Sequence, residues 1–344
     1  MEKTILDTSG SLPAMSLDPL DEIMLPWNRE NAPGLAVGVY KNGILTHSRC
    51  SGLANIETCE PITTATNFRL ASVSKALTAM AIMILKEAGD LRYDQLLTEF
   101  FPEFRSYGMD ITLRQLMNHT SGMPDYEDLI PAEQTKQIQD IEVVELLARQ
   151  SKTYFVPGSA YRYSNSGYVI LGIIVAKISG MSFSDFLQER IFAPLDMNQT
   201  IAFENSRHVI THRAFGYTAT DGDFKQTDQS ITSATLGDGG VYSSLAEFGK
   251  WDQALDASRL VSLSTMDEAF MPARLTSGEA TTYGFGWVID TFEGRRRISH
   301  TGSTIGFRST VVRFPDQKIT VLVLSNDAGT AAMDLATRVA RVYL

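Results

Sequence analysis

Apolar positions near both ends of the chain follow the patterns of β-strands. The stretch GLAVGVYKNGILTHSR, residues 34–49, contains two strand-like runs joined by Asn42-Gly43, a strong signal for a two-residue hairpin turn. Late in the chain, turn-forming residues separate four further strand-like runs, at 284–290, 296–302, 308–314 and 318–325. This distribution predicts an antiparallel sheet to which both terminal regions contribute strands.

Between these regions, apolar residues recur at helical spacing. A serine or threonine three residues before an acidic residue or glutamine marks several helix starts, as in Thr112-x-x-Gln115. Glycines such as Gly89 and Gly180 mark helix ends. Helices are predicted at 17–30, 72–88, 166–179 and 329–343, with shorter ones after Thr112, Ser182 and Ser244.

The order of the predicted elements indicates an α+β fold, in which an antiparallel sheet flanked by helices stands beside a mainly helical second subdomain. Residues 1–15 are predicted to form an N-terminal arm, and residues 16–344 a single domain. Within that domain, the sheet subdomain would comprise about 16–71 and 236–344, and the helical subdomain about 72–235. A cleft between two such subdomains is where a binding site is expected.

Composition narrows the classes of partner and compartment. The chain has 344 residues, of which 44% are hydrophobic and 20% charged, as is typical of globular proteins. Its net charge of −10 argues against nucleic acid or an anionic membrane as the main partner, and leaves a small-molecule substrate open. The apolar runs 76–85 and 168–176 are too short to span a bilayer. No signal-peptide pattern is seen, so a cytoplasmic protein is predicted. Cys50 and Cys59 are interpreted as free thiols, and the oligomeric state stays unknown.

A serine and a lysine at the start of a predicted helix are the first candidates for chemistry. Ser72 precedes Lys75 by three residues, so that both side chains share one face of the helix. Lys75 opens the uncharged run 76–85, although the positive end of a helix disfavours a cation. A serine hydroxyl needs a base to become a nucleophile, and an apolar setting favours the neutral amine that can act as one. S-x-x-K alone also fits a helix start whose lysine reaches water.

Two later motifs could complete such a site. Tyr163 and Asn165 form Y-x-N before an apolar helix, where a tyrosine near a lysine can act as base or acid and an amide can hold a substrate carbonyl. His300 and Gly302 form H-x-G on a predicted strand. Gly302 is expected to let a substrate backbone approach, and the N–H of Ser303 could complete an oxyanion hole.

Taken together, S-x-x-K, Y-x-N and H-x-G occur in this order along the chain. The sequence resembles the superfamily of serine β-lactamases and penicillin-binding proteins, on the branch of class C β-lactamases, D-stereospecific peptidases and carboxylesterases. Further matching stretches lie at 113–124, 192–200, 239–251, 283–287 and 302–326. The resemblance covers about residues 20–340 and implies that 16–344 form a single β-lactamase-like catalytic domain.

The resemblance also implies roles for individual residues. Ser72 would be the acylated nucleophile and Lys75 its activator. Tyr163 would be the partner base, which protonates the leaving group and activates the deacylating water. The sequence leaves open which of Lys75 and Tyr163 takes the first proton, because coupled groups titrate as a pair.

The remaining motif residues would bind the substrate. Asn165 would contact the amide or ester group, and the N–H groups of Ser72 and Ser303 would form the oxyanion hole. His300 and Thr301 would line the opposite wall of the cleft.

Two departures from the family pattern bear on the substrate. Most relatives have a lysine where His300 stands, and that lysine helps to hold a substrate carboxylate. The strand 287–290 also lacks a basic residue, although Arg295 to Arg297 could supply one if they reach the cleft. A site without a fixed cation loses charge-assisted hydrogen bonds to a carboxylate. We therefore predict a carboxylesterase acting on small acyl esters. The alternatives are a D-stereospecific peptidase or D,D-carboxypeptidase, a weak β-lactamase, an acyltransferase and a slow acylated sensor.

Other catalytic arrangements find less support. The chain has five histidines but no G-x-S-x-G motif, so a Ser-His-Asp hydrolase is not favoured. His119 is interpreted as a structural hydrogen-bonding residue in a turn. His208-x-x-x-His212 and Glu204 lack the H-E-x-x-H pattern of a zinc hydrolase. No metal and no cofactor are predicted.

Overall fold

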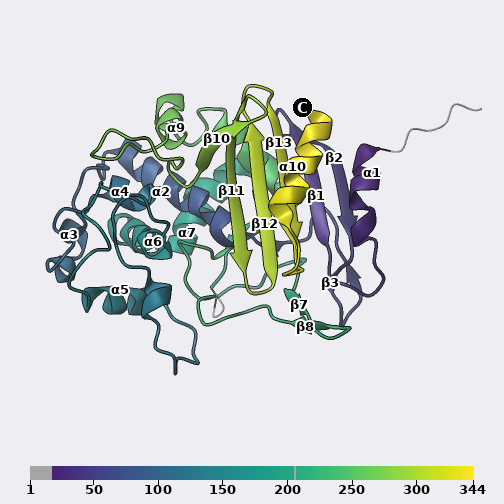
Figure 1. Ribbon diagram of the computed structural model, residues 1–344, viewed down its shortest axis with the longest axis horizontal. Helices are drawn as coiled ribbons and strands as arrows, with labels where there is room; N and C mark the ends of the chain where they lie inside the picture. The colour runs from purple at the N-terminus through teal and green to yellow at the C-terminus, as the bar shows by residue number, and fades with distance from the viewer. Residues whose placement is uncertain (1–17, 205–206) are drawn as a thin grey trace, which may run out of the picture.

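A six-stranded antiparallel sheet forms the centre of the computed structural model, which describes residues 18–204 and 207–344. The predicted arm, residues 1–15, lies outside the described residues. The strand order is β10-β11-β12-β13-β1-β2 (Figure 1). The strands are β1 (Leu35–Lys41), β2 (Ile44–Ser51), β10 (Val288–Phe292), β11 (Arg295–Thr304), β12 (Phe307–Phe314) and β13 (Ile319–Ser325).

The predicted hairpin and the pairing of the two ends of the chain are both present. Asn42 and Gly43 adopt φ angles of 53° and 72°, the left-handed conformation that a tight hairpin turn requires. Strand β1 pairs with β2 on one side and with β13 on the other, so that Leu35 lies opposite Ser325. The first and last strands of the sheet's sequence order therefore become neighbours in space.

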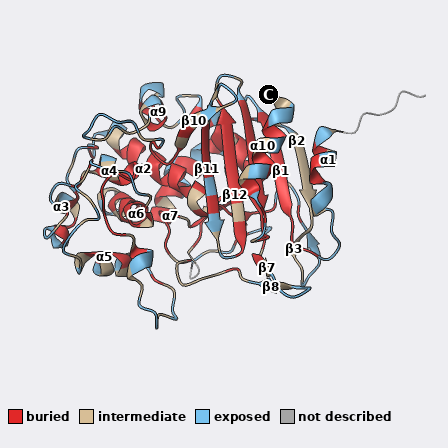
Figure 2. Cartoon of the chain, in the orientation of Figure 1, coloured by how far each residue is buried: buried red, intermediate tan, exposed pale blue. Residues whose placement is uncertain are grey.

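Helices cover both faces of the sheet. Helices α1 (Pro19–Met24) and α10 (Ala332–Tyr343) pack on one face, where α10 crosses β12 and β13 in Figure 1. Helix α8 (Leu245–Leu255) packs against β1, β2 and β13. Figure 2 shows the central strands buried along most of their length, because neither face is left to solvent. This double covering explains the nearly continuous apolar run of β1.

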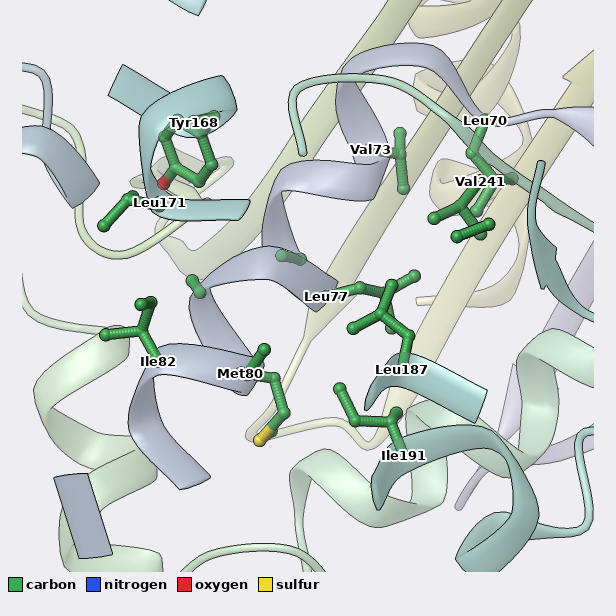
Figure 3. Packing of buried hydrophobic residues seen from close by; sticks show 14 of the residues in the cluster. Leu70, Val73, Leu77, Met80, Ile82, Tyr168, Leu171, Leu187, Ile191 and Val241 are labelled. Carbon is green, nitrogen blue, oxygen red and sulfur yellow. The ribbon is translucent and has the colours of Figure 1, made fainter. Parts of the chain in front are cut away.

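The helices beside the sheet pack around α2 (Lys75–Ala88). Its residues from Lys75 to Leu85 are all buried, and Gly89 ends it with a φ of 84°. Figure 3 shows Leu77 and Met80 of α2 among apolar side chains of other segments, including Leu187 and Ile191. The other helices are α3 (Leu97–Phe100), α4 (Leu113–Met117), α5 (Asp140–Ala148), α6 (Asn165–Ser179), α7 (Phe183–Leu187) and α9 (Leu263–Ala269).

Shorter elements complete the described chain. Single helical turns of the 3₁₀ type lie at Leu25–Trp27, Ala71–Ser74, Pro102–Phe104, Tyr126–Leu129 and Ala193–Leu195, and one π turn lies at Gln188–Phe192. Three small sheets are formed by β3 (Leu53–Asn55) with β4 (Glu60–Pro61), by β5 (Phe68–Arg69), β9 (Val241–Ser243) and β6 (Ile201–Ala202), and by β7 (Tyr217–Ala219) with β8 (Phe224–Gln226).

Two predicted elements differ from those observed. The helix expected at 17–30 is interrupted at Pro26, where a 3₁₀ turn replaces it. The strand expected at 284–290 begins only at Val288. Gly286 has a φ of 77°, and a Cβ there would lie 2.8 Å from the Cα of Ala76. This segment therefore turns against the backbone of α2 before the strand starts.

Within residues 18–204 and 207–344, no single helix has the length and hydropathy needed to cross a membrane. Helices Asn165–Ser179 and Phe183–Leu195 meet that criterion only when joined, and they are bent by 79° at the break between them.

Candidate active site

Lys75 points inward to Ser72. Ser72 lies in the 3₁₀ turn Ala71–Ser74, and Lys75 is the first residue of α2. The Nζ of Lys75 donates to Ser72 Oγ at 3.1 Å, to Asn165 Oδ1 at 2.8 Å and to the carbonyl oxygen of Asp238 at 2.8 Å. Three acceptors match the three N–H donors of an ammonium group. Since Lys75 has no exposed surface, the alternative of a lysine reaching water does not apply.

The backbone before Ser72 is held in an unusual conformation. Ala71 has a φ of 48°, which a residue with a Cβ adopts only at some energetic cost. The turn packs against β11, where a Cβ on Gly302 would overlap the carbonyl oxygen of Leu70. Ser309 Oγ donates to that same carbonyl at 2.6 Å. Gly302 was expected to admit a substrate backbone, but its missing side chain makes room for the protein's own turn.

Tyr163 lies beside Lys75. The Nζ of Lys75 is 5.0 Å from the centroid of the Tyr163 ring. The hydroxyl of Tyr163 is buried and forms no hydrogen bond within the part of the chain that the structure describes. The ring of His119 packs at 4.3 Å between centroids, and His119 Nδ1 accepts from the N–H of Ser164, as expected of a structural histidine. Tyr163 thus packs against Lys75 and His119, and its hydroxyl is unpaired among the described residues.

Asn165 is fixed on three sides at the start of α6. Its backbone N–H donates to Asp125 Oδ2 at 2.8 Å, which satisfies one of the free donors at the helix N-terminus. Its side-chain Nδ2 donates to Glu127 Oε1 at 3.0 Å, and its Oδ1 accepts from Lys75. These contacts determine the orientation of the amide and join Lys75 to the acidic segment of Asp125 and Glu127.

His300 lies behind the cleft, contrary to the expectation that it lines the wall. It is 3% exposed, and its Nδ1 is 2.7 Å from the carbonyl oxygen of Thr301. Because a carbonyl only accepts, Nδ1 carries the proton, and Nε2 accepts from the Tyr283 hydroxyl at 2.8 Å. Burial and the charge of Lys75 lower the pKa of His300 to about 3. The imidazole is therefore neutral and immobilised.

Thr301 also differs from its expected place. It is exposed and lines a separate hollow with Arg308 and Thr310 below the start of α10. Thr301 pairs with Thr310 across the two strands, so that both side chains lie on the same face of the sheet. Ser303 lines this hollow too, but it also borders the cleft that contains Ser72.

The cleft itself joins segments from distant parts of the sequence. Strand β10 pairs with Arg295–Ser299 of β11, so that within the described chain 300–304 have no strand partner on that side. This free edge reaches the cleft at Ser303 and Thr304. The residues that line the cleft are Arg69, Ala71, Ser72, Glu127, Asn165, Thr232, Thr235, Asp238, Gly239, Ser303 and Thr304.

Charged residues in the cleft were not found from the sequence, because no motif marks them. Arg69 and Glu127 both border it. Desolvation raises the pKa of Glu127, and the negative charges of Asp125 and Asp238 raise it further. A carboxylate in such surroundings favours a cationic ligand.

The arginines that sequence reasoning offered as substitutes are occupied elsewhere. Arg297 forms a two-bond ion pair with Asp290, at 2.7 and 2.6 Å. Arg296 donates to the carbonyl oxygen of Phe270. Neither Arg296 nor Arg297 is among the described residues that line the cleft, whereas Arg69 is. Among the described residues, no group of three His, Cys, Asp or Glu side chains is placed to hold a metal ion.

A comparison with protein families matches the β-lactamase family to residues 20–344. The chain belongs to the β-lactamase family. One similar protein is penicillin-binding protein 4* of Bacillus subtilis. It is 34% identical over 301 residues, and the match covers 83% of this chain. D-aminopeptidase of Cereibacter sphaeroides is 32% identical over 324 residues, matched by 92% of this chain. The chain spans 66% and 61% of the lengths of these two β-lactamase-family relatives.

Solved structures of this family share the fold. The octameric penicillin-binding protein homologue from Pyrococcus abyssi superposes with a TM-score of 0.81 at 25% identity, over 94% of this chain and 75% of the other. D-amino acid amidase from Ochrobactrum anthropi SV3, in complex with L-phenylalanine amide, superposes with a TM-score of 0.79 at 25% identity, over 95% and 98% of the two chains. The β-lactamase fold and the predicted family are thereby confirmed.

Proposed function

We propose that this chain is a serine hydrolase that cleaves amides and peptides after an N-terminal D-amino-acid residue, through an acyl-enzyme on Ser72. The carboxylate of Glu127 carries this proposal, because it borders the same cleft as Ser72. One oxygen of Glu127 accepts from Asn165, and Asn165 in turn accepts from Lys75. A substrate ammonium group bound to Glu127 would thus lie one residue away from the nucleophile's activator.

The charges of the cleft support a substrate with a free amino group over a neutral ester. Desolvation raises the pKa values of Asp125 and Glu127, and neighbouring negative charges raise them further, so a positive group beside them would stabilise their carboxylates. An α-ammonium group would supply that charge at the position next to the scissile carbonyl. The D configuration is supported by the names of similar proteins, a D-aminopeptidase and a D-amino acid amidase.

In the proposed reaction, Ser72, Lys75 and Tyr163 act in both the acylation and the deacylation step. Ser72 Oγ attacks the carbonyl carbon of the substrate, and its proton passes to the Lys75–Tyr163 pair. The N–H groups of Ser72 and Ser303 stabilise the resulting oxyanion. When the C–N bond breaks, the pair returns the proton to the departing amine, with the Tyr163 hydroxyl as donor. An ester between Ser72 and the D-aminoacyl group remains.

Deacylation reverses the proton path. A water molecule attacks the ester carbonyl and gives a proton to the Lys75–Tyr163 pair. The C–O bond to Ser72 breaks, Ser72 Oγ recovers the proton, and the D-amino acid leaves as a carboxylic acid that gives its remaining proton to solvent. His300 takes no proton in either step, because its hydrogen bonds to Thr301 and Tyr283 already use both ring nitrogens.

A carboxylesterase for small acyl esters is the second candidate. The observation in its favour is that neutral His300 stands where a lysine would hold a substrate carboxylate. In an esterase, Ser72 would act in the same way on an alcohol leaving group, and the cleft charges would contribute little to binding. The two candidates therefore differ in whether the substrate's amino group is required.

The deciding experiment compares substrates that differ only in that amino group. We expect kcat/KM for D-alanine p-nitroanilide to exceed that for propionyl p-nitroanilide, and likewise D-alanine methyl ester to exceed methyl propionate. Glu127→Gln should lower the ratio of kcat/KM for the D-alanyl substrate to kcat/KM for the propionyl substrate by about 10–100-fold. This is the effect expected for the loss of a charge-assisted hydrogen bond of about 1.5–3 kcal/mol. Asp128→Asn is the matched control, because Asp128 is exposed and pairs with Arg162 outside the cleft.

Three results would contradict the proposal in whole or in part. If the propionyl substrates are hydrolysed as well as the D-alanyl substrates, the carboxylesterase assignment is the correct one. If L-alanine p-nitroanilide is preferred to its D enantiomer, the stereochemical part is wrong. Ser72→Ala should abolish turnover of every substrate, and a variant that keeps full activity would remove the nucleophile assignment altogether.

A further inference from the structure

Arg69 is a buried cation at the cleft that forms no ion pair with any described residue, although Asp238 borders the same cleft. It lies in β5, three residues before Ser72, and only 3% of it is exposed. Its Nε donates to the carbonyl oxygen of Gly239 at 3.1 Å, and its Nη2 to that of Ser233 at 3.0 Å. No carboxylate of the described residues forms an ion pair with it, whereas the nearby Arg213 pairs with Asp228.

The guanidinium group has donors left for a ligand. Arginine has five N–H donors, and the two carbonyls occupy one at Nε and one at Nη2. Nη1 bonds to no residue in the described part of the chain, and the side chain lines the cleft of Ser72. A buried charge is costly unless it is paired, so this position favours an anion that arrives with the substrate. A carboxylate is the anion whose geometry an arginine matches with two parallel hydrogen bonds.

The position of Arg69 relative to the proposed catalytic groups indicates which part of the substrate bears the carboxylate. The leaving group has to approach Tyr163, which is proposed to protonate it. Tyr163 is not among the residues that line this cleft, whereas Glu127, Asn165 and Arg69 are. The cleft therefore receives the acyl part of the substrate, with the amino group at Glu127 and the side chain toward Arg69.

We infer that Arg69 binds a carboxylate on the side chain of the acyl group, so that the preferred substrates are amides or peptides of an acidic D-residue such as D-glutamate. This inference rests on the proposed function for the identity of the acyl group. The contact between the Arg69 guanidinium and a carboxylate does not depend on the proposed function, because it requires only that the ligand enter the cleft.

The first experiment measures a preference in the wild-type protein. D-Glutamic acid α-p-nitroanilide and its D-glutamine counterpart differ only in the charge of the side chain. We expect kcat/KM to be at least about tenfold higher for the D-glutamyl substrate, equivalent to about 1.4 kcal/mol. Arg69→Met should reduce that ratio toward one. Equal values for the two substrates in the wild-type protein would overturn the inference.

Arg308→Met is the matched control. Arg308 is also partly buried and donates to two backbone carbonyls, those of Thr304 and Phe307, but it lines the hollow near the start of α10 and not the cleft of Ser72. Its replacement should leave the ratio unchanged. If Arg69→Met and Arg308→Met both keep the wild-type ratio, Arg69 only holds the Ser233 and Gly239 loop in place, and the inference is wrong.

A binding measurement separates this inference from the proposed function and does not depend on a folded Arg69 variant. Butyrate and its amide, butyramide, lack the amino group and differ by one carboxylate. Calorimetric titration of the wild-type protein should give at least tenfold tighter binding of butyrate. If D-amides are not hydrolysed but this difference persists, the proposed function fails and the role of Arg69 stands. Equal affinities would overturn the role of Arg69 even if D-amides are cleaved.

Discussion

Mild acid should destabilise the folded protein through His300, and His300→Gln should remove that effect. Burial and the charge of Lys75 hold the pKa of His300 at about 3, against 6.5 for an ordinary histidine. Between these two values the unfolded chain binds a proton that the folded protein excludes, so stability falls as pH falls. With these two pKa values, the loss is negligible at pH 7.5 and reaches about 2 kcal/mol at pH 5.

Urea unfolding of both proteins at pH 7.5, 6 and 5 measures this difference. At pH 7.5, His300→Gln is expected to be the less stable protein, because glutamine fits the bonds to Thr301 and Tyr283 imperfectly. The gap should narrow by about 2 kcal/mol on going to pH 5, since only the wild type loses the His300 contribution. Burial lowers the pKa of His119, and the charges of Lys75 and His300 lower it further, so both proteins also lose stability through His119 as the pH falls.

Tyr283→Phe is the control that keeps the titrating group. It removes the donor to His300 Nε2 and should cost about 1–3 kcal/mol, the penalty for an unsatisfied buried polar atom. Its dependence on pH should still resemble that of the wild type. A gap between wild type and His300→Gln that is the same at pH 5 and pH 7.5 would refute the conclusion that His300 is a neutral, buried residue.

Three further substitutions test the packing and the helix starts. Arg313→Met should destabilise the fold by about 3–5 kcal/mol in urea unfolding, because it leaves the buried carboxylate of Asp252 without its partner at 2.7 Å. Gly302→Ala should cost about 1–3 kcal/mol and reduce kcat, because the added Cβ overlaps the turn before Ser72; unchanged kcat would show that β11 does not position this turn. Thr112→Ala should cost about 1 kcal/mol, since Thr112 caps α4 and accepts from Gln115, and a thermal midpoint equal to wild type would contradict that role.

The sequence alone determined those features that depend on neighbouring residues. Asn42-Gly43 requires left-handed backbone angles and therefore marked the hairpin correctly. The Thr112 capping box was equally readable, because its two hydrogen bonds join residues three positions apart. The spacing of Ser72 and Lys75 predicted their contact for the same reason, since one helical turn brings such side chains together. The order of the three motifs then indicated the family.

Only the tertiary structure decided how distant segments share the space around Ser72. Arg69 and Glu127 have no local signal, and they border the cleft because the β5–β9 pairing and the start of α6 bring their segments to it. His300 lies behind the cleft because its neighbour Thr301 and the distant Tyr283 bind both ring nitrogens. Hydrophobic spacing predicts which face of a helix or strand is buried, but it does not specify which other segment will cover that face. The charge of a binding cleft depends on which segments pack around it, so it was decided by the tertiary structure.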